Sequence, residues 1–190
     1  MGKCVEEFVV GDVAVSPART VTETDVVMYS WVSGDLNPMH TDAVFAGASP
    51  IGARIAHGTL GMSIVTGLSS RIGDFDGTAV AAIGVYDWTF LAPIFINDTV
   101  HLRATVQSAR VSASKPDRGV VERLMELVNQ DGTVVQLGIM KTMTLSRAGV
   151  AASAPFSGKA QSATGCALLH DLLPQSQRSM KKKQKKSKKK

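Results

Sequence analysis

The most restrictive feature of this sequence is a change in its apolar periodicity near residue 77. Beyond this point apolar and polar residues alternate, most clearly where Val100, Leu102 and Ala104 are separated by His101 and Arg103. A period of two is typical of a strand with one buried face. The alternation predicts four long strands, over residues 79–88, 99–111, 119–129 and 133–145. Consecutive strands without intervening helices favour an antiparallel sheet.

Helical signals are confined to the first half of the chain. Thr22, with an aspartate three residues later, has the form of a capping box and predicts a helix over residues 23–33. A short second helix is expected to begin at Thr41, and a third over residues 57–70. Three glycines in the third helix each cost about 1 kcal/mol relative to alanine, which indicates close wrapping by a sheet. With a further strand over residues 13–21, the pattern predicts an α+β fold, one sheet on a central helix.

The net charge of +5 comes from one end of the chain. Eight lysines lie in the last ten residues, and without them 13 basic residues face 16 acidic ones, a balance of −3. Of the ten aromatic residues, only Phe156 lies beyond residue 147. We therefore expect one domain over residues 1–147 and a low-complexity, disordered tail over 148–190. The lysine run lacks aromatic residues that would stack on bases, so nucleic acid is not favoured as a partner.

The remaining composition indicates a globular protein outside the secretory route. Apolar residues make up 44% of the chain, which is enough for a core. No run approaches the ~18–20 apolar residues of a membrane span, and the N-terminus lacks the regions of a signal peptide. Cys4 and Cys166 have no metal-ligand spacing and are expected to be free thiols. The expected location is the cytoplasm.

One segment carries residues suited to acid–base chemistry, because residues 33–40 read Ser-Gly-Asp-Leu-Asn-Pro-Met-His. On a continuous helix Asp35 and His40 would be turned about 140° apart and could not act on one atom. The glycine and the proline break the helix, so a loop can direct both side chains into one cavity. A carboxylate beside an imidazole can hold and deprotonate a water molecule. Asp35 and His40 are therefore the candidate catalytic pair.

A second segment could bind negative charge. His57 and Gly58 stand at the start of the expected central helix, where backbone N–H groups lack helical partners and the dipole is positive. The backbone N–H of Gly58 could therefore stabilise a developing oxyanion. His57 could face a ligand, but a histidine at the start of a buried helix is more often a hydrogen-bonded structural residue.

Together these motifs resemble the MaoC-like hot-dog family, which includes (R)-specific enoyl-CoA hydratases and 3-hydroxyacyl thioester dehydratases of fatty acid metabolism. The resemblance covers about residues 10–146 and rests on four segments, residues 22–25, 33–40, 54–58 and 87–93. It implies a single hot-dog fold, an antiparallel sheet wrapped around a long central helix. It also implies a homodimer with an acyl-CoA thioester bound near the subunit interface.

The resemblance also implies roles for the candidate residues. Asp35 and His40 would hold the water that adds to C3 of a trans-2-enoyl thioester, giving an (R)-3-hydroxyacyl thioester. The N–H of Gly58 would bind the thioester oxygen. Neither a metal nor a redox cofactor is implied. Which side chain is the acid and which the base stays open, because the two can titrate together.

Several other residues are weaker candidates. Asn37 is expected to orient the loop, and Ser63 matches a small hydroxyl that lines the family's pocket. Arg54, Lys115 and Arg118 could bind the phosphates of CoA. Charge alone indicates this, and solvated surface side chains are the more common case. Residues 46–54 are expected to shape the acyl pocket, but the length of the acyl chain cannot be predicted.

The sequence leaves two alternatives open. The same residues would serve a 3-hydroxyacyl-acyl-carrier-protein dehydratase of fatty-acid synthesis, and no sequence feature separates the two carriers. A rival from another class is a non-catalytic thioester-binding module whose basic tail tethers it to an anionic partner. A thioesterase on the same fold is less favoured, because the signature at residues 33–40 belongs to hydratases.

Overall fold

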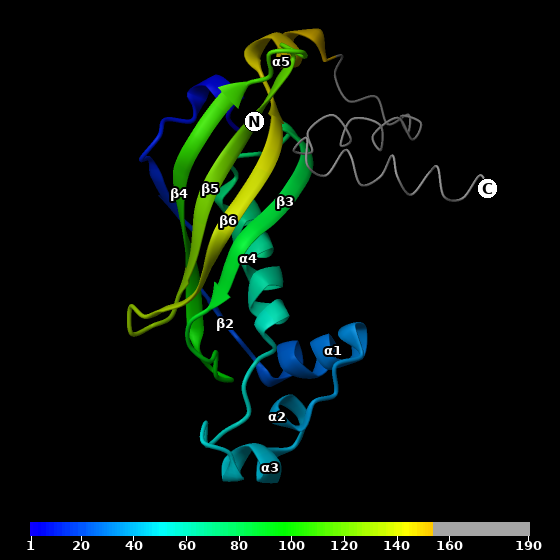
Figure 1. Cartoon of the computed structure of the whole chain (residues 1–190), viewed down its shortest axis with the longest axis vertical. Coiled ribbons are helices and arrows are strands. Elements are labelled where there is room, and N and C mark those ends of the chain that lie inside the picture. The colour runs from blue at the N-terminus through cyan, green and yellow to red at the C-terminus, as the bar shows by residue number, and fades with distance from the viewer. Residues whose placement is uncertain (154–190) are drawn as a thin grey trace, which may run out of the picture. The chain divides into compact units, whose positions relative to one another are not determined.

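The computed structural model describes residues 1–153, which form a six-stranded antiparallel sheet with helices (Figure 1). The strands follow the order β1-β4-β5-β6-β3, and β2 also pairs with β4. Their bounds are β1 (Val13–Val15), β2 (Arg19–Thr20), β3 (Ala79–Phe90), β4 (Thr99–Val111), β5 (Arg118–Val128) and β6 (Val134–Leu145). The four long strands lie within two residues of their predicted bounds, and the α+β fold class is confirmed.

Most helices precede the long strands. The helical elements are η1 (Val5–Glu7, a 3-10 helix), α1 (Glu23–Ser33), α2 (Pro38–Thr41), α3 (Ala43–Ala48), α4 (Gly58–Ile72) and α5 (Arg147–Ala152). Helix α1 has its predicted bounds, with the capping box of Thr22 at its start and Gly34 at its end, at a φ of 73°. Helix α4 continues two residues beyond its predicted end, to a left-handed Gly73.

The prediction of a single short helix that begins at Thr41 is wrong, because two short helices occupy this segment. Pro38 is the first residue of α2, a position where no N–H is needed, and the side chain of Asn37 caps the helix. Asp42 caps α3 and accepts hydrogen bonds from two backbone N–H groups. The proline therefore starts a helix where it was expected only to break one.

The prediction of a single strand over residues 13–21 is also wrong. This part of the chain forms two strands, β1 and β2, separated by a segment that contains Pro17, which has no N–H to donate to a ladder. The hydroxyl of Ser16 compensates in part, since it accepts a hydrogen bond from the N–H of Leu102 on β4 (2.9 Å). The chain thus stays beside β4 across the break.

The main core lies between α4 and the sheet, along which the helix runs in Figure 1. Burial of apolar surface, at about 25 cal/mol per Å², stabilises this contact. Its buried members include Leu60, Ile64, Val65 and Leu68 of α4, with Leu102, Ala104, Met125, Leu127 and Val135 of the sheet. The first turn of α4, which forms part of the candidate site, is thereby fixed to the strands.

Two glycines allow the strands to approach this first turn closely. A Cβ on Gly61 would overlap the side-chain amide of Gln136, and one on Gly58 would lie 2.9 Å from the ring of Phe90. The close wrapping predicted from the glycines is therefore correct at the start of α4. It is wrong for Gly67, where a Cβ would meet nothing within 4 Å.

None of the helices within residues 1–153 combines the length and the apolar character needed to cross a bilayer. Cys4 is buried and forms no disulfide within this region. The predictions made for the tail from residue 154 onward, including the lysine run and Cys166, lie outside the described residues.

The capping box of α1 provides a test of the fold. Replacing Thr22 with alanine removes the hydroxyl that accepts the N–H of Asp25 (3.3 Å), and should lower the free energy of unfolding by about 1 kcal/mol. Urea denaturation measures this loss. Thr24→Ala, at an exposed position in the same turn, is the matched control and should change stability by less than about 0.5 kcal/mol. Equal losses in the two variants would contradict the role of the cap.

Candidate active site

The loop between α1 and α2 is held by its own side chains. After Gly34, the hydroxyl of Ser33 accepts a hydrogen bond from the N–H of Asp35 (3.2 Å). The Asp35 carboxylate accepts one from the N–H of Asn37 (3.1 Å), and the Asn37 side-chain oxygen accepts one from Met39 (3.0 Å). These local bonds hold the carboxylate between the end of one helix and the start of the next.

His40 lies at the end of α2 with its ring fixed by one hydrogen bond. Its Nδ1 is 2.8 Å from the backbone carbonyl oxygen of Ile55. A carbonyl oxygen can only accept, so Nδ1 carries a proton and donates it. In the neutral ring Nε2 is then unprotonated, and its lone pair is available to a water molecule or a substrate.

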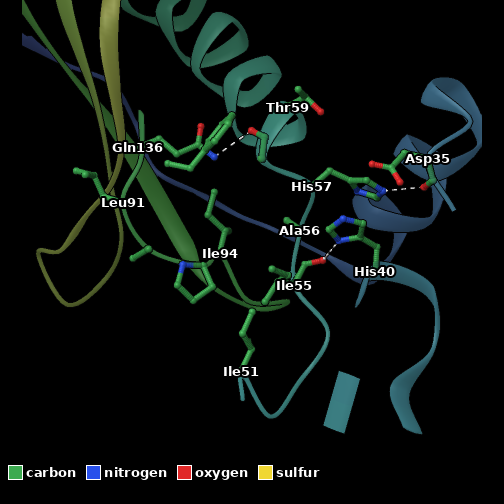
Figure 2. Close-up of a pocket in the computed structure, with 14 residues that line it drawn as sticks. Asp35, His40, Ile51, Ile55, Ala56, His57, Thr59, Leu91, Ile94 and Gln136 are labelled. Atoms are coloured by element: carbon green, nitrogen blue, oxygen red, sulfur yellow. Dashed lines mark hydrogen bonds between the residues drawn. The ribbon is translucent and has the colours of Figure 1, made fainter. Parts of the chain in front are cut away.

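His57 joins this loop to the start of α4. Its ring is almost completely buried, with 1% of the residue exposed, and Nε2 donates to the backbone carbonyl of Asp35 (3.0 Å). The hydroxyl of Ser30 lies 3.3 Å from the same nitrogen. The ring stacks on that of His40, with centroids 3.8 Å apart (Figure 2). The structural role expected for His57 therefore has a physical basis.

Asp35, His40 and His57 form one cluster, in which ligand atoms of the three side chains lie within 4.8 Å of one another. The structure thus brings together the carboxylate and the imidazole that the broken helix was expected to direct into one cavity. At this separation one water molecule can bond to both the Asp35 carboxylate and the imidazole of His40.

The same cluster is the set of side chains in residues 1–153 that could ligate a metal ion. One nitrogen of each ring already donates to a backbone carbonyl. The groups left for another ligand are the Asp35 carboxylate and the second nitrogen of each ring.

The cluster lies at one end of a cavity of about 510 Å³ (Figure 2). The opposite wall is mostly apolar and comes from the segments before α4 and after β3, with Gln136 of β6 as its polar member. The apolar lining consists of Ile51, Ile55, Ala56, Phe90, Leu91, Ala92, Pro93 and Ile94. A polar end facing an apolar wall suits a ligand with a reactive polar group and a short hydrocarbon portion.

The first turn of α4 supplies free donors to this cavity. The N–H groups of Leu60 and Gly61 both donate to the carbonyl of His57 (3.0 and 3.2 Å). Within residues 1–153 no acceptor takes a hydrogen bond from the N–H of Gly58 or Thr59, and both residues line the cavity. Two free N–H groups at a positive helix end can bind an oxyanion.

The structure does not bring the other predicted residues to this cavity. Ser63 is exposed and donates to the carbonyl of Thr59 (3.0 Å), because six residues of helix place it about 9 Å beyond His57. Arg54 forms an ion pair with Glu23 of α1 through two hydrogen bonds (2.8 and 2.6 Å), which connects the segment before α4 to α1.

Lys115 and Arg118 lie at the turn between β4 and β5, where the chain is bonded to the start of α5. In Figure 1 this end of the sheet is opposite the end that carries α1 and α2. Arg118 is paired with Asp117. Within this chain neither residue contributes to the cavity, so their assignment to a CoA site has no support from the structure.

Sequence reasoning missed Thr59, Phe90 and Gln136. Thr59 directly follows the predicted Gly58, so the helix start could have indicated it. Gln136 is a single amide in the apolar segment Val-Val-Gln-Leu, and it is 2% exposed. A polar residue at an inward position of a strand was the available signal, but its partners are far away in the sequence.

The hydrogen bonds of the two rings predict opposite tautomers. Neutral His40 should carry its proton on Nδ1 and neutral His57 on Nε2, because each of these nitrogens donates to a carbonyl. Long-range ¹⁵N–¹H correlation spectra distinguish the tautomers, and His40→Ala and His57→Gln assign the signals. His101, which lies on β4, provides a reference ring. A neutral His40 protonated on Nε2 would contradict the geometry described above.

Comparisons with known proteins agree with this architecture. Residues 8–127 match the MaoC like domain family. Protein MaoC of Klebsiella aerogenes is 33% identical over 109 residues, 57% of this chain and 32% of that protein. A protein of Rhodospirillum rubrum named (R)-specific enoyl-CoA hydratase is 31% identical over 97 residues, 49% of this chain and 62% of that protein. The chain thus spans less than two thirds of these relatives.

The solved structure of a MaoC-like dehydratase from Rhodospirillum rubrum has a TM-score of 0.68 and 26% identity, and the match covers 77% of this chain and 99% of that chain. The arrangement of sheet and helix is the hot-dog fold that such neighbours share. The family match spans the loop of Asp35 and His40 and the start of α4. The chain therefore belongs to the family of MaoC-like domains.

Proposed function

We propose that this protein catalyses the reversible (R)-specific hydration of a trans-2-enoyl-CoA to an (R)-3-hydroxyacyl-CoA. The observation that carries the proposal is the placement of the Asp35 carboxylate and the free Nε2 of His40 in one cavity with the free N–H groups of Gly58 and Thr59. The relative named (R)-specific enoyl-CoA hydratase supports the same reaction.

The chemistry follows from these groups. A water molecule between Asp35 and His40 transfers one proton to the pair while its oxygen bonds to C3 of the enoyl thioester. The electrons of the C2–C3 double bond shift toward the thioester oxygen, which gains negative charge beside the N–H groups of Gly58 and Thr59. The pair then delivers a proton to C2. One molecule of water has been added, and the pair returns to its initial protonation state.

The apolar wall is the proposed site for the acyl chain. Ile51, from the segment expected to shape the acyl pocket, and Ile55 line it from one side, and Leu91 and Ile94 lie nearby in Figure 2. Burial of hydrocarbon against these side chains contributes about 0.8 kcal/mol per CH₂ group, which holds the reacting carbons near the polar cluster.

We further propose that the reaction needs no metal and no redox cofactor. Adding water to a double bond transfers no net electrons, and the required charge stabilisation can come from backbone N–H groups. Asp35, His40 and His57 are the side chains that a metal would need, and two of these are the proposed proton carriers.

The proposal predicts that Asp35→Asn and His40→Ala each lower the rate of hydration about 10²- to 10⁴-fold, because each removes a proton carrier. The loss of enoyl-thioester absorbance with crotonyl-CoA, in buffer containing EDTA, measures this rate. Asp12→Asn and His101→Ala, outside the cavity lining, are the matched controls and should retain activity.

Near-normal turnover in both Asp35→Asn and His40→Ala would refute the mechanism. Activity on carrier-protein thioesters but not on CoA thioesters would instead identify a dehydratase of fatty-acid synthesis. Binding of both thioesters with no turnover by the unmodified protein would indicate a non-catalytic binding module.

We also propose that the protein forms a homodimer through β3. This strand pairs with β6 on one side and forms an edge of the sheet on the other. Val80, Val85 and Tyr86 leave 38 to 39% of their surface exposed on it. An edge strand presents unpaired N–H and C=O groups, to which a strand of a second chain can pair.

Val85→Glu should therefore convert the protein from dimer to monomer, because a charge on an edge strand opposes pairing. Light scattering after size-exclusion chromatography measures the mass. Val111→Glu is the matched control, since Val111 is 40% exposed at the end of β4. The proposed interface would be contradicted if the unmodified protein were a monomer. It would also be contradicted if Val85→Glu formed a dimer as stable as that of Val111→Glu.

A further inference from the structure

Gln136 is a buried amide that connects the sheet to the first turn of α4. Its Nε2 donates to the backbone carbonyl of Gly58 (3.0 Å), and its Oε1 accepts from Nε1 of Trp88 (3.2 Å). The residue is 2% exposed and lines the cavity opposite the histidine cluster (Figure 2). One side chain thus joins β6, β3 and the start of the helix that supplies the free N–H groups.

Local features of three elements make room for this connection. The absence of a Cβ on Gly61 lets the amide of Gln136 lie against the helix, and Gly138 leaves space for the ring of Trp88. Asp87 has a φ of 51° at an irregularity in the pairing of β3 with β6. This irregularity precedes Trp88 directly, in a segment where a bulge can redirect a side chain. The backbone of β3 is therefore adapted to bring an indole N–H to the amide.

The bond to the Gly58 carbonyl adds a directional restraint to the first turn of α4, which the core already packs against the sheet. Glycine has wide conformational freedom, and the side chain of His57 makes no capping hydrogen bond at this helix end. The carbonyl of Gly58 belongs to the same peptide group as the N–H of Thr59. A donor at this oxygen fixes the plane of the peptide and polarises it, which makes the Thr59 N–H a stronger donor.

Packing alone would not require an amide at this position. A methionine has similar length and would fill the same space without the cost of burying two polar atoms. The amide is instead bonded at both ends to groups that are themselves placed by the fold. An oriented, buried amide is suited to holding a catalytic turn in one geometry, since misplaced oxyanion donors lose much of their effect.

We infer that Gln136, oriented by Trp88, is a positioning residue that fixes the Gly58–Thr59 peptide as the oxyanion-binding turn. The inference rests on the proposed function, because it assigns a second residue to the same chemistry. It predicts a loss of transition-state stabilisation when the amide is removed, with little change in the binding of the ground-state substrate.

The test compares Gln136→Met with Gln107→Met, the same change at an exposed residue of β4. With crotonyl-CoA, Gln136→Met should lower kcat about 10- to 100-fold, less than the loss of an oxyanion donor itself. KM should change by less than about threefold. Trp88→Phe keeps an aromatic ring but removes the donor to Oε1, and should lower kcat in the same direction by a smaller factor.

A spectroscopic measurement separates positioning from a general loss of structure. Cinnamoyl-CoA is a conjugated thioester whose absorbance moves to longer wavelength when donors polarise its carbonyl. The unmodified protein and Gln107→Met should produce this shift, and Gln136→Met should produce a smaller one at saturation. Circular dichroism gives the folded fraction, to which each kcat is normalised.

The outcomes distinguish the inference from the function on which it rests. Unchanged kcat and an unchanged cinnamoyl-CoA absorbance shift in Gln136→Met would overturn the inference about Gln136. Hydration of crotonyl-CoA by the unmodified protein would still support the proposed function in that case. A loss that follows only the folded fraction would also overturn it. If Gln136→Met does not fold, the kcat and the cinnamoyl-CoA absorbance shift of Trp88→Phe test the inference instead, and unchanged values of both would overturn it. If the unmodified protein hydrates neither crotonyl-CoA nor a carrier-protein crotonyl thioester, both the proposed function and the inference about Gln136 are refuted.

Discussion

The hydrogen bond from the buried ring of His57 to the backbone carbonyl of Asp35 joins the two segments on which the site depends. One segment ends α1 and carries the carboxylate, and the other begins α4 and presents free N–H groups. The stacking of His57 on His40 adds the second proton carrier to the same arrangement. The bond from His40 to the carbonyl of Ile55 connects the same two segments a second time.

The rest of the fold holds this connection in place from two sides. The core between α4 and the sheet fixes the helix that begins at Gly58, and the ion pair between Arg54 and Glu23 holds the preceding segment against α1. On the side of the sheet, Gln136 contacts the same first turn. The site therefore combines a rigid helix start with a loop whose own hydrogen bonds limit its conformations, as preorganised catalysis requires.

Local patterns were sufficient for most elements of the fold. Alternation predicted the long strands within two residues, and the capping box predicted α1, because these signals arise from neighbouring residues. Pro38 was misleading, since proline can break a helix or begin one, and only the cap by Asn37 distinguishes the two cases. The break at Pro17 depended in the same way on contacts with β4.

The site was predictable only in part. The glycine and the proline between Asp35 and His40 indicated that the two could share a cavity, and the structure places them there. Charge suggested Lys115 and Arg118, but charge says nothing of distance, and these residues lie at the other end of the sheet. Gln136 could not be assigned from sequence, because its partner Gly58 is 78 residues away.

A crystal structure of the Asp35→Asn variant with 3-hydroxybutyryl-CoA would test the proposed site most directly. The thioester oxygen should lie within hydrogen-bond distance of the Gly58 or Thr59 N–H, and the 3-hydroxyl should lie between residue 35 and Nε2 of His40. The acyl methyl group should contact the apolar wall near Ile55 or Ile94. A thioester bound with its carbonyl away from the start of α4, or outside this cavity, would refute the proposed mechanism.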